Sequence, residues 1–156
     1  MISFGGAMKS FKRYIPVVLL ILHCGLIFFF SSQNAESSSG MSKGLLRMIL
    51  ELTPVVKNFS EPMFLATEHI VRKTAHFVLY LILGIYAYLS AESVDLKRKL
   101  LPALLFCLIY AASDEFHQLF SAGRSGQISD VCLDFCGSSV GVGITTLIKK
   151  KLKKEE

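Results

Sequence analysis

Four long apolar runs, separated by short polar segments, set the pattern of this chain. Crossing the roughly 30 Å of hydrocarbon in a bilayer takes about 20 helical residues, and each run reaches or can be extended to that length. The pattern predicts an all-α integral membrane protein, a bundle of four transmembrane helices. We expect these helices at about 14–32, 69–89, 100–120 and 130–148.

The second of these helices has to include charged residues. Its purely apolar part, 77–89, is too short for a span, since a span needs about 20 residues. The helix must therefore reach back to about residue 69, and Arg72, Lys73 and His76 enter the membrane with it.

The polar segments complete the predicted domain plan. Serine and glycine in SSQNAESSSGMSK, 31–43, are typical of a loop, whereas the partly amphipathic pattern of 43–52 predicts a short interfacial helix. Both fall within a predicted extracytoplasmic loop, 34–68. We expect the basic segment 149–156 to be a solvated cytoplasmic tail, and the whole chain, 1–156, to form one domain.

Composition agrees with a membrane protein. Of the 156 residues, 52% are hydrophobic and only 19% are charged, and the mean hydropathy is +0.50, which is too apolar for the surface of a soluble domain. The net charge of +5 would suit nucleic acid. The basic residues instead form short clusters that flank apolar runs, as membrane proteins place them. The expected partner is therefore the lipid bilayer and not nucleic acid.

The placement of lysine and arginine predicts the orientation, because cytoplasmic segments of membrane proteins are enriched in both. With the N-terminus inside, eleven of the 17 basic residues lie in the inner segments, at 9–13, 97–99 and 149–154. The remaining six are spread over the outer segments. Both termini are therefore predicted to be cytoplasmic.

This orientation brings every unusual polar group to the outer half of the membrane. Helical spacing places Arg72, His76 and Tyr80 on one face of the second helix, and Asp114, His117 and Gln118 on one face of the third. The candidate site residues are Gln33, Arg72, Lys73, His76, Tyr80, Asp114, Glu115, His117, Gln118, Arg124, Asp130 and Asp134.

Glycines mark two further features near these residues. Gly123 and Gly126 are expected to be the turn residues of the short outer loop between the third and fourth helices. Gly137 and Gly141 lie one turn apart on the fourth helix, and small residues at this spacing let another helix approach closely. We interpret the second pair as a packing feature.

The outer charges have two interpretations. An ionised side chain costs about 2.5–3.5 kcal/mol at the centre of a membrane helix on insertion scales, so charges at this depth should pair or face a wet cavity. Three cations facing four carboxylates would suit a purely structural ion-pair network. His76 and His117 also point outward, and charge balance does not require them. Their presence favours an outward-facing polar pocket.

Four spaced motifs in this region resemble the VanZ-like family, named after the teicoplanin-resistance protein. They are FFFSSQ at 28–33, RKTAHFVLYLILG at 72–84, SDEFHQLFSAGRSGQISDVCLD at 113–134 and GSSVG at 137–141. The resemblance implies a multi-pass protein of the bacterial cytoplasmic (inner) membrane with a role in the cell envelope. It also implies reduced sensitivity to a lipoglycopeptide such as teicoplanin, but it supplies no reaction.

Three functions remain open. The first is an enzyme acting on an anionic envelope lipid or lipid-linked glycan, with Arg72, Lys73 and Arg124 binding phosphate. His117 would then be a general base oriented by Asp114. The second is a non-catalytic binder or an accessory subunit of an envelope complex. The third is a small transporter, which the absence of polar residues in the inner half disfavours.

No cofactor is predicted, because the sequence lacks a strong metal motif. The alternative is a mixed site for Zn²⁺ or Mn²⁺. Its ligands would come from His76, His117, Asp114, Asp130 and Asp134.

Overall fold

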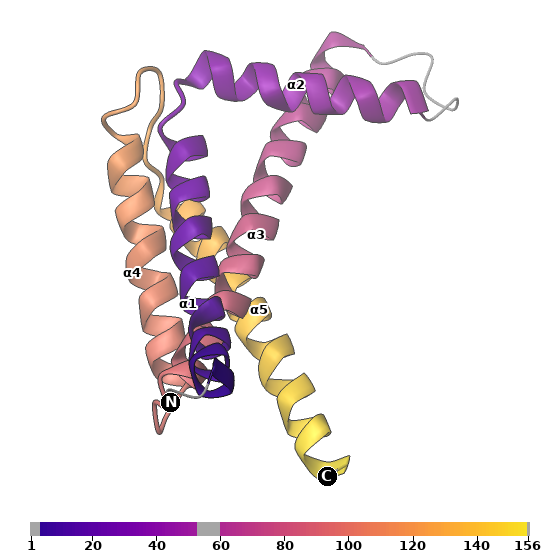
Figure 1. Ribbon diagram of the computed structural model, residues 1–156. Helices are drawn as coiled ribbons and strands as arrows, with labels where there is room; N and C mark the ends of the chain where they lie inside the picture. The colour runs from indigo at the N-terminus through magenta and orange to yellow at the C-terminus, as the bar shows by residue number, and fades with distance from the viewer. Residues whose placement is uncertain (1–3, 53–59, 156) are drawn as a thin grey trace.

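The structure is a computed structural model that describes residues 4–52 and 60–155. Within those ranges the chain forms only helices (Figure 1). They are α1 (Phe4–Ser31), α2 (Ala35–Leu52), α3 (Glu61–Ser93), α4 (Leu100–Gln118) and α5 (Ile128–Glu155). All except α2 are long and apolar enough to cross a membrane. The predicted all-α class and the four predicted spans are confirmed.

Three spanning helices extend well beyond the predicted limits. α1 begins at Phe4, about ten residues earlier than predicted. α3 begins eight residues earlier, directly after Ser60 and with Pro62 in its first turn, where proline costs no helical hydrogen bond. α5 continues through 149–155, so the basic tail is helical over these residues. Lys149 lies 2.7 Å from Glu92 of α3, and lysines near a helix C-terminus also interact favourably with the helix dipole.

α2 corrects the prediction for the polar segment after α1. The residues 35–42 were expected to form a loop, but they belong to an 18-residue helix. The side-chain oxygen of Asn34 accepts a hydrogen bond from the Ser37 backbone N–H at 2.7 Å, which caps the helix and offsets the weak helix propensity of serine. The segment 53–59 of the predicted loop lies outside the described residues.

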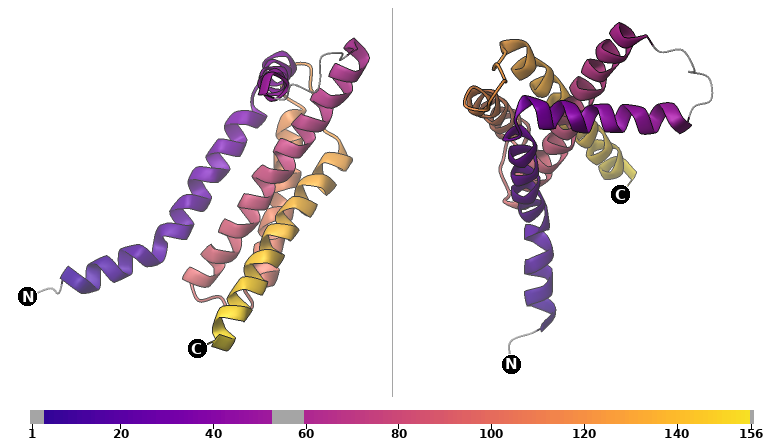
Figure 2. Two further views of the ribbon diagram at one scale, coloured as in Figure 1. Left: turned by 90° about the vertical axis from the view of Figure 1, so that its right-hand side faces the viewer. Right: turned by 90° about the horizontal axis from the view of Figure 1, so that it is seen from above.

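The arrangement of the helices is simple. α2 lies crosswise over one end of the bundle, and both termini lie at the opposite end (Figure 1). We call the first of these the α2 end. The N-terminal part of α1 diverges from the other helices in both views of Figure 2. α3 is the central helix, because it contacts each of the other four.

The closest helix contact is that between α3 and α5, and glycines make it possible. A methyl group on Gly141 would lie 2.0 Å from the backbone oxygen of Leu81, and one on Gly84 would lie 2.1 Å from that of Ser138. Gly137 meets the backbone of Phe77 in the same way. The predicted role of Gly137 and Gly141 in packing is confirmed.

The apolar core fills the middle of the bundle and the half away from α2. It consists of Ile27, Tyr80, Leu83, Ala87, Tyr88, Ala103, Cys107, Ala111 and Val142. Large side chains such as Ile21, Leu22, Ile109 and Leu147 are instead more than half exposed. Outward-facing apolar residues at this density are expected where lipid is the surrounding solvent.

The loop between α4 and α5 returns the chain at the α2 end. Gly123 has a positive φ of 74°, which glycine adopts without steric cost. A Cβ on Gly126 would lie 2.7 Å from the Glu115 backbone oxygen. Both glycines thus allow the tight path that was predicted for this loop.

Candidate functional site

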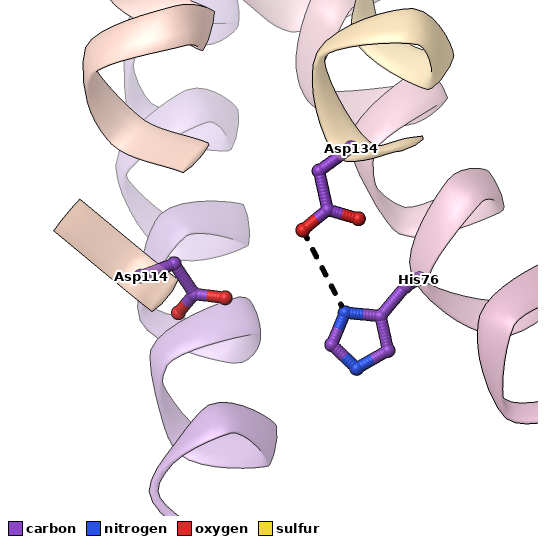
Figure 3. A group of neighbouring side chains, drawn as sticks. All are labelled: His76, Asp114 and Asp134. Atoms are coloured by element: carbon purple, nitrogen blue, oxygen red, sulfur yellow. Dashed lines mark ion pairs between the residues drawn. The ribbon is translucent and has the colours of Figure 1, made fainter. Parts of the chain in front are cut away.

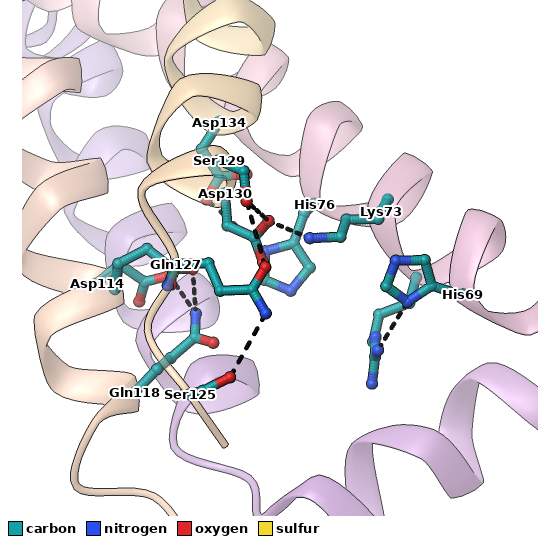
Figure 4. Close-up of polar contacts among 12 residues, drawn as sticks. His69, Lys73, His76, Asp114, Gln118, Ser125, Gln127, Ser129, Asp130 and Asp134 are labelled. Carbon is teal, nitrogen blue, oxygen red and sulfur yellow. Dashed lines mark hydrogen bonds and ion pairs between the residues drawn. The ribbon is translucent and has the colours of Figure 1, made fainter.

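A polar cavity of about 140 Å³ lies at the α2 end. α3 supplies a basic face, α5 supplies two aspartates, and the loop between α4 and α5 closes the third side (Figure 4). The cavity is lined by Ala35, His69, Arg72, Lys73, His76, Gln118, Gly123, Arg124, Ser125, Gln127, Asp130, Leu133 and Asp134. Such a concave site with convergent polar groups is the usual form of a ligand pocket.

One wall of the cavity is an ion pair between α3 and α5. The Lys73 ammonium donates to the Asp130 carboxylate, and the two side chains retain 28% and 24% of their exposure. Partly exposed pairs of this kind stabilise a protein by at most about 1 kcal/mol.

At the inner end of the cavity, His76 of α3 meets two carboxylates. Its Nδ1 lies 3.8 Å from Oδ2 of Asp134, and Asp114 of α4 faces both groups (Figure 3). One ligand atom from each residue lies within 4.8 Å of the others. Asp134 has an exposed fraction of 0% and Asp114 of 4%. Neither oxygen of Asp134 has a hydrogen-bond partner among the described residues.

Two arginines flank the mouth of the cavity. Arg72 donates to Nδ1 of His69 at 3.0 Å, and Arg124 donates to the backbone oxygen of Ser31 at 3.4 Å. Burial and the nearby Arg72 lower the pKa of Arg124, while Asp114 raises it. Arginine remains charged in proteins, so two guanidinium groups are held close together without carboxylates bonded to them.

A second set of buried polar groups holds the loop in place. Glu115 accepts hydrogen bonds from the Gln118 side chain at 3.0 Å and from the Gln127 backbone N–H at 2.9 Å. Gln118 also contacts Asp114 at 3.4 Å. Because a charged acceptor makes strong hydrogen bonds, Glu115 fixes the loop that carries Arg124.

A mainly apolar groove of about 230 Å³ lies directly beside the polar cavity. It runs between α1, α2 and α3. The groove is lined by Phe30, Ser38, Met41, Ser42, Leu45, Val71, Arg72, Ala75, His76, Leu79 and Arg124. Arg72, His76 and Arg124 belong to both cavities. The site therefore consists of a polar cavity with cationic side chains and an apolar groove next to it.

The structure brings most of the predicted site residues together. Arg72, Lys73, His76, Gln118, Arg124, Asp130 and Asp134 line the polar cavity, and Asp114 adjoins it through His76 and Asp134. These residues come from three helices and one loop. Their convergence at one end of the bundle is the arrangement that hydropathy and helical spacing predict.

Besides Asp114, four predicted site residues do not line the polar cavity. The ring of His117 packs against Phe28, with centroids 4.6 Å apart, and its Nδ1 is buried without a hydrogen-bond partner among the residues that the structure describes. Tyr80 lies in the apolar core, and the Gln33 side chain donates to the Phe29 backbone oxygen at 3.2 Å. Glu115 serves the loop. Of the two predicted histidines, His76 is the one at the cavity.

Several lining residues escaped the sequence analysis. Ser125 and Gln127 lie in the loop between α4 and α5. The sequence of a polar loop does not show which of its side chains point into a cavity. Met41, Leu45 and Leu79 line the groove, and in sequence they look like ordinary packing residues. The helical extension of α2 was missing for Met41, and the position of α2 beside α3 was missing for Leu45.

The fold and the site define a class: a multi-pass helical membrane protein with a buried, charged cavity near one end of its bundle. The sequence model of the VanZ/LLP1 family matches residues 16–149, which is most of the chain. The chain belongs to the VanZ/LLP1 family. Neither the comparison with curated proteins nor that with solved structures gave a match.

Proposed function

We propose that the cavity at the α2 end binds the phosphorylated head group of an anionic envelope lipid or lipid-linked glycan. The supporting observation is that the polar cavity and the apolar groove share three lining residues, Arg72, His76 and Arg124. Guanidinium groups suit phosphate oxygens. The groove suits the hydrocarbon chain that such a lipid carries, and its burial there is favourable.

The proposal includes an orientation. Both termini face the cytoplasm, the protein lies in the bacterial cytoplasmic (inner) membrane, and the cavity faces the extracytoplasmic side. α2 then rests on the extracytoplasmic surface of the cytoplasmic membrane, with its apolar face toward lipid. The excess of lysine and arginine at the end that carries the termini supports this direction.

Cysteine labelling tests the orientation. Single cysteines replace the exposed Ser37 and Ser125 in a chain whose four native cysteines are changed to serine. An impermeant maleimide added to intact cells should label both positions. Labelling of both only after the membrane is opened would contradict the proposed direction.

Binding of a lipid precursor also offers a link to antibiotics. The proposal includes that a lipoglycopeptide such as teicoplanin acts on the same class of lipid at the outer leaflet. A protein that binds the same class of lipid there would lower the sensitivity of the cell to the antibiotic. We propose this as the phenotype, supported by the family and by the amphiphilic site.

A second candidate function is catalysis at the same head group. His76 lies at the inner end of the cavity, with Asp134 facing its ring at 3.8 Å. A carboxylate beside an imidazole fixes its tautomer and supports general base catalysis. Release of inorganic phosphate from a polyisoprenyl phosphate by the purified protein, lost in His76→Gln, would favour an enzyme over a binder.

The binding proposal is tested with the protein in lipid nanodiscs. The probes are a polyisoprenyl monophosphate and the matching polyisoprenol, and affinity is measured by thermophoresis. Arg72→Ala and Arg124→Ala should each weaken binding of the phosphate about 10-fold or more, since hydrogen bonds to charged groups are worth about 1.5–3 kcal/mol. The control is Arg98→Ala, an exposed arginine between α3 and α4.

The two probes separate head-group binding from simple partitioning. The wild type should bind the phosphate at least about 10-fold more tightly than the alcohol, the value of one charge-assisted contact. Equal affinity for both probes, or equal losses in Arg98→Ala and the two site variants, would contradict the proposal.

A further inference from the structure

The residues at the inner end of the cavity form a distinct cluster within it. His76, Asp114 and Asp134 come from three different helices, and their side chains point at one another (Figure 3). One ligand atom from each lies within 4.8 Å of the other two. Three ionisable groups are therefore gathered in a space of a few ångströms.

Among the described residues, the cluster can supply at most one balancing charge, that of a protonated His76. Both oxygens of Asp134 are buried and, within 4–52 and 60–155, have no hydrogen-bond partner. The 3.8 Å to His76 exceeds hydrogen-bond range. A protonated imidazole neutralises only one of the two carboxylates. An ionised carboxylate is retained in a protein interior when it is paired or coordinates a metal.

The neighbouring cations are engaged elsewhere. Lys73 is paired with Asp130, Arg72 donates to His69, and Arg124 donates to the Ser31 backbone oxygen. Within the described residues, none of the three makes a hydrogen bond or ion pair with Asp114 or Asp134. Charge balance at the cluster must come from a proton or from a bound cation.

We propose that His76, Asp114 and Asp134 bind a divalent transition metal. One imidazole nitrogen and two carboxylate oxygens are a ligand set that suits Mn²⁺ or Zn²⁺, and a divalent ion balances two carboxylates beside a neutral imidazole. Ligand atoms bound at about 2.0–2.2 Å lie at most about 4.4 Å apart. The observed spacing therefore needs only small side-chain rotations to close around an ion.

The site has an open side, as catalytic metal sites do. His76 and Asp134 line the polar cavity, so the positions that the three ligands leave free face that space. If the cavity binds phosphate as proposed above, a phosphate oxygen can reach the metal. This last step rests on the proposed function, whereas metal binding itself does not.

Metal binding is measured directly on lipid-free protein in detergent. The protein is stripped with a chelator, dialysed against MnCl₂ or ZnCl₂, and analysed for metal content. Bound Mn²⁺ is also followed by electron paramagnetic resonance. We expect about one ion per chain, and an affinity at least about 10-fold weaker in Asp134→Asn and in His76→Gln, the loss that even outer-shell changes can cause.

Glu68→Gln is the matched control. Glu68 lies on α3, is buried and has one oxygen with no hydrogen-bond partner in the described part of the chain, but it stands outside the cluster. The Glu68→Gln variant should bind the metal with the affinity of the wild type. All variants should elute as monodisperse protein. Sub-stoichiometric binding to the wild type, or equal loss in Glu68→Gln, would overturn the proposal.

The outcome separates this site from the lipid site. Arg124→Ala should lose the polyisoprenyl phosphate and keep the metal. A protein that binds the metal but no lipid phosphate would overturn only the proposed function. A protein that binds the lipid phosphate but no metal would overturn only the metal site.

Discussion

The two halves of this bundle bury opposite kinds of side chain. In the half away from α2, α3 and α5 touch through Gly84 and Gly141, and the buried residues include Leu83, Ala87 and Val142. At the α2 end the same two helices bury His76 against Asp134, whose oxygens have no hydrogen-bond partner among the described residues.

The contrast separates stability from function. Close helix contacts through small residues are the main source of stability in membranes, because lipid is as apolar as the side chains. Buried carboxylates without partners cost stability. The half away from α2 therefore accounts for the fold, and the α2 end keeps groups that stability alone does not explain.

The largest effect is expected from a change in the tightly packed half. Gly141→Ala places a methyl group 2.0 Å from the Leu81 backbone oxygen. Because backbone cannot rotate away, we expect a loss of about 3 kcal/mol or more of unfolding free energy, measured by denaturation in detergent. Gly143→Ala, with no atom within 4 Å of its new Cβ, should be neutral or stabilising by about 1 kcal/mol. Equal losses in both would break the contrast.

A change at the α2 end should act in the opposite direction. Asp134→Asn keeps the shape of the side chain and removes a buried carboxylate whose oxygens have no hydrogen-bond partner among the described residues. In chelator, where no metal is bound, we expect the free energy of unfolding to rise by about 1–3 kcal/mol. A loss of similar size would favour the alternative of a structural ion-pair network over a functional pocket.

The smallest effect concerns the groove. Ala75 lines it and is exposed, so Ala75→Trp should fill the groove with little change in stability. Binding of polyisoprenyl phosphate in nanodiscs should weaken about 10-fold, which corresponds to about 1.4 kcal/mol. Ala66→Trp, on an exposed position of α3 outside the groove, is the control. Equal affinities of the two variants would remove the groove from the binding site.

The spans were predictable because membrane thickness sets the length of an apolar run. The secondary structure of the residues outside the apolar runs was harder to predict. Hydropathy did not reveal that Asn34 caps α2 or that Pro62 starts α3, because caps depend on single side chains. The helical tail of α5 was missed because exposed lysines are compatible with helix and coil alike.

The candidate site was predictable as a set and not residue by residue. Spacing along each helix put Arg72, His76 and Asp134 at one end of the bundle. It also put His117 one turn from Asp114, and the structure has the His117 ring against Phe28 instead. The rotation of α4 about its axis decides which face meets the cavity, and that rotation follows from packing between helices.

The most direct measurement is the identity of the lipid that stays with the protein on extraction from bacterial membranes. Native mass spectrometry of the wild type should show about one phosphorylated lipid per chain. This is the value expected for a single site when the lipid concentration is well above the dissociation constant. Arg98→Ala should retain that lipid, and the double variant Arg72→Ala/Arg124→Ala should lose it. The same lipids in all three proteins, or no phosphorylated lipid in the wild type, would contradict a phosphate-binding cavity at the α2 end.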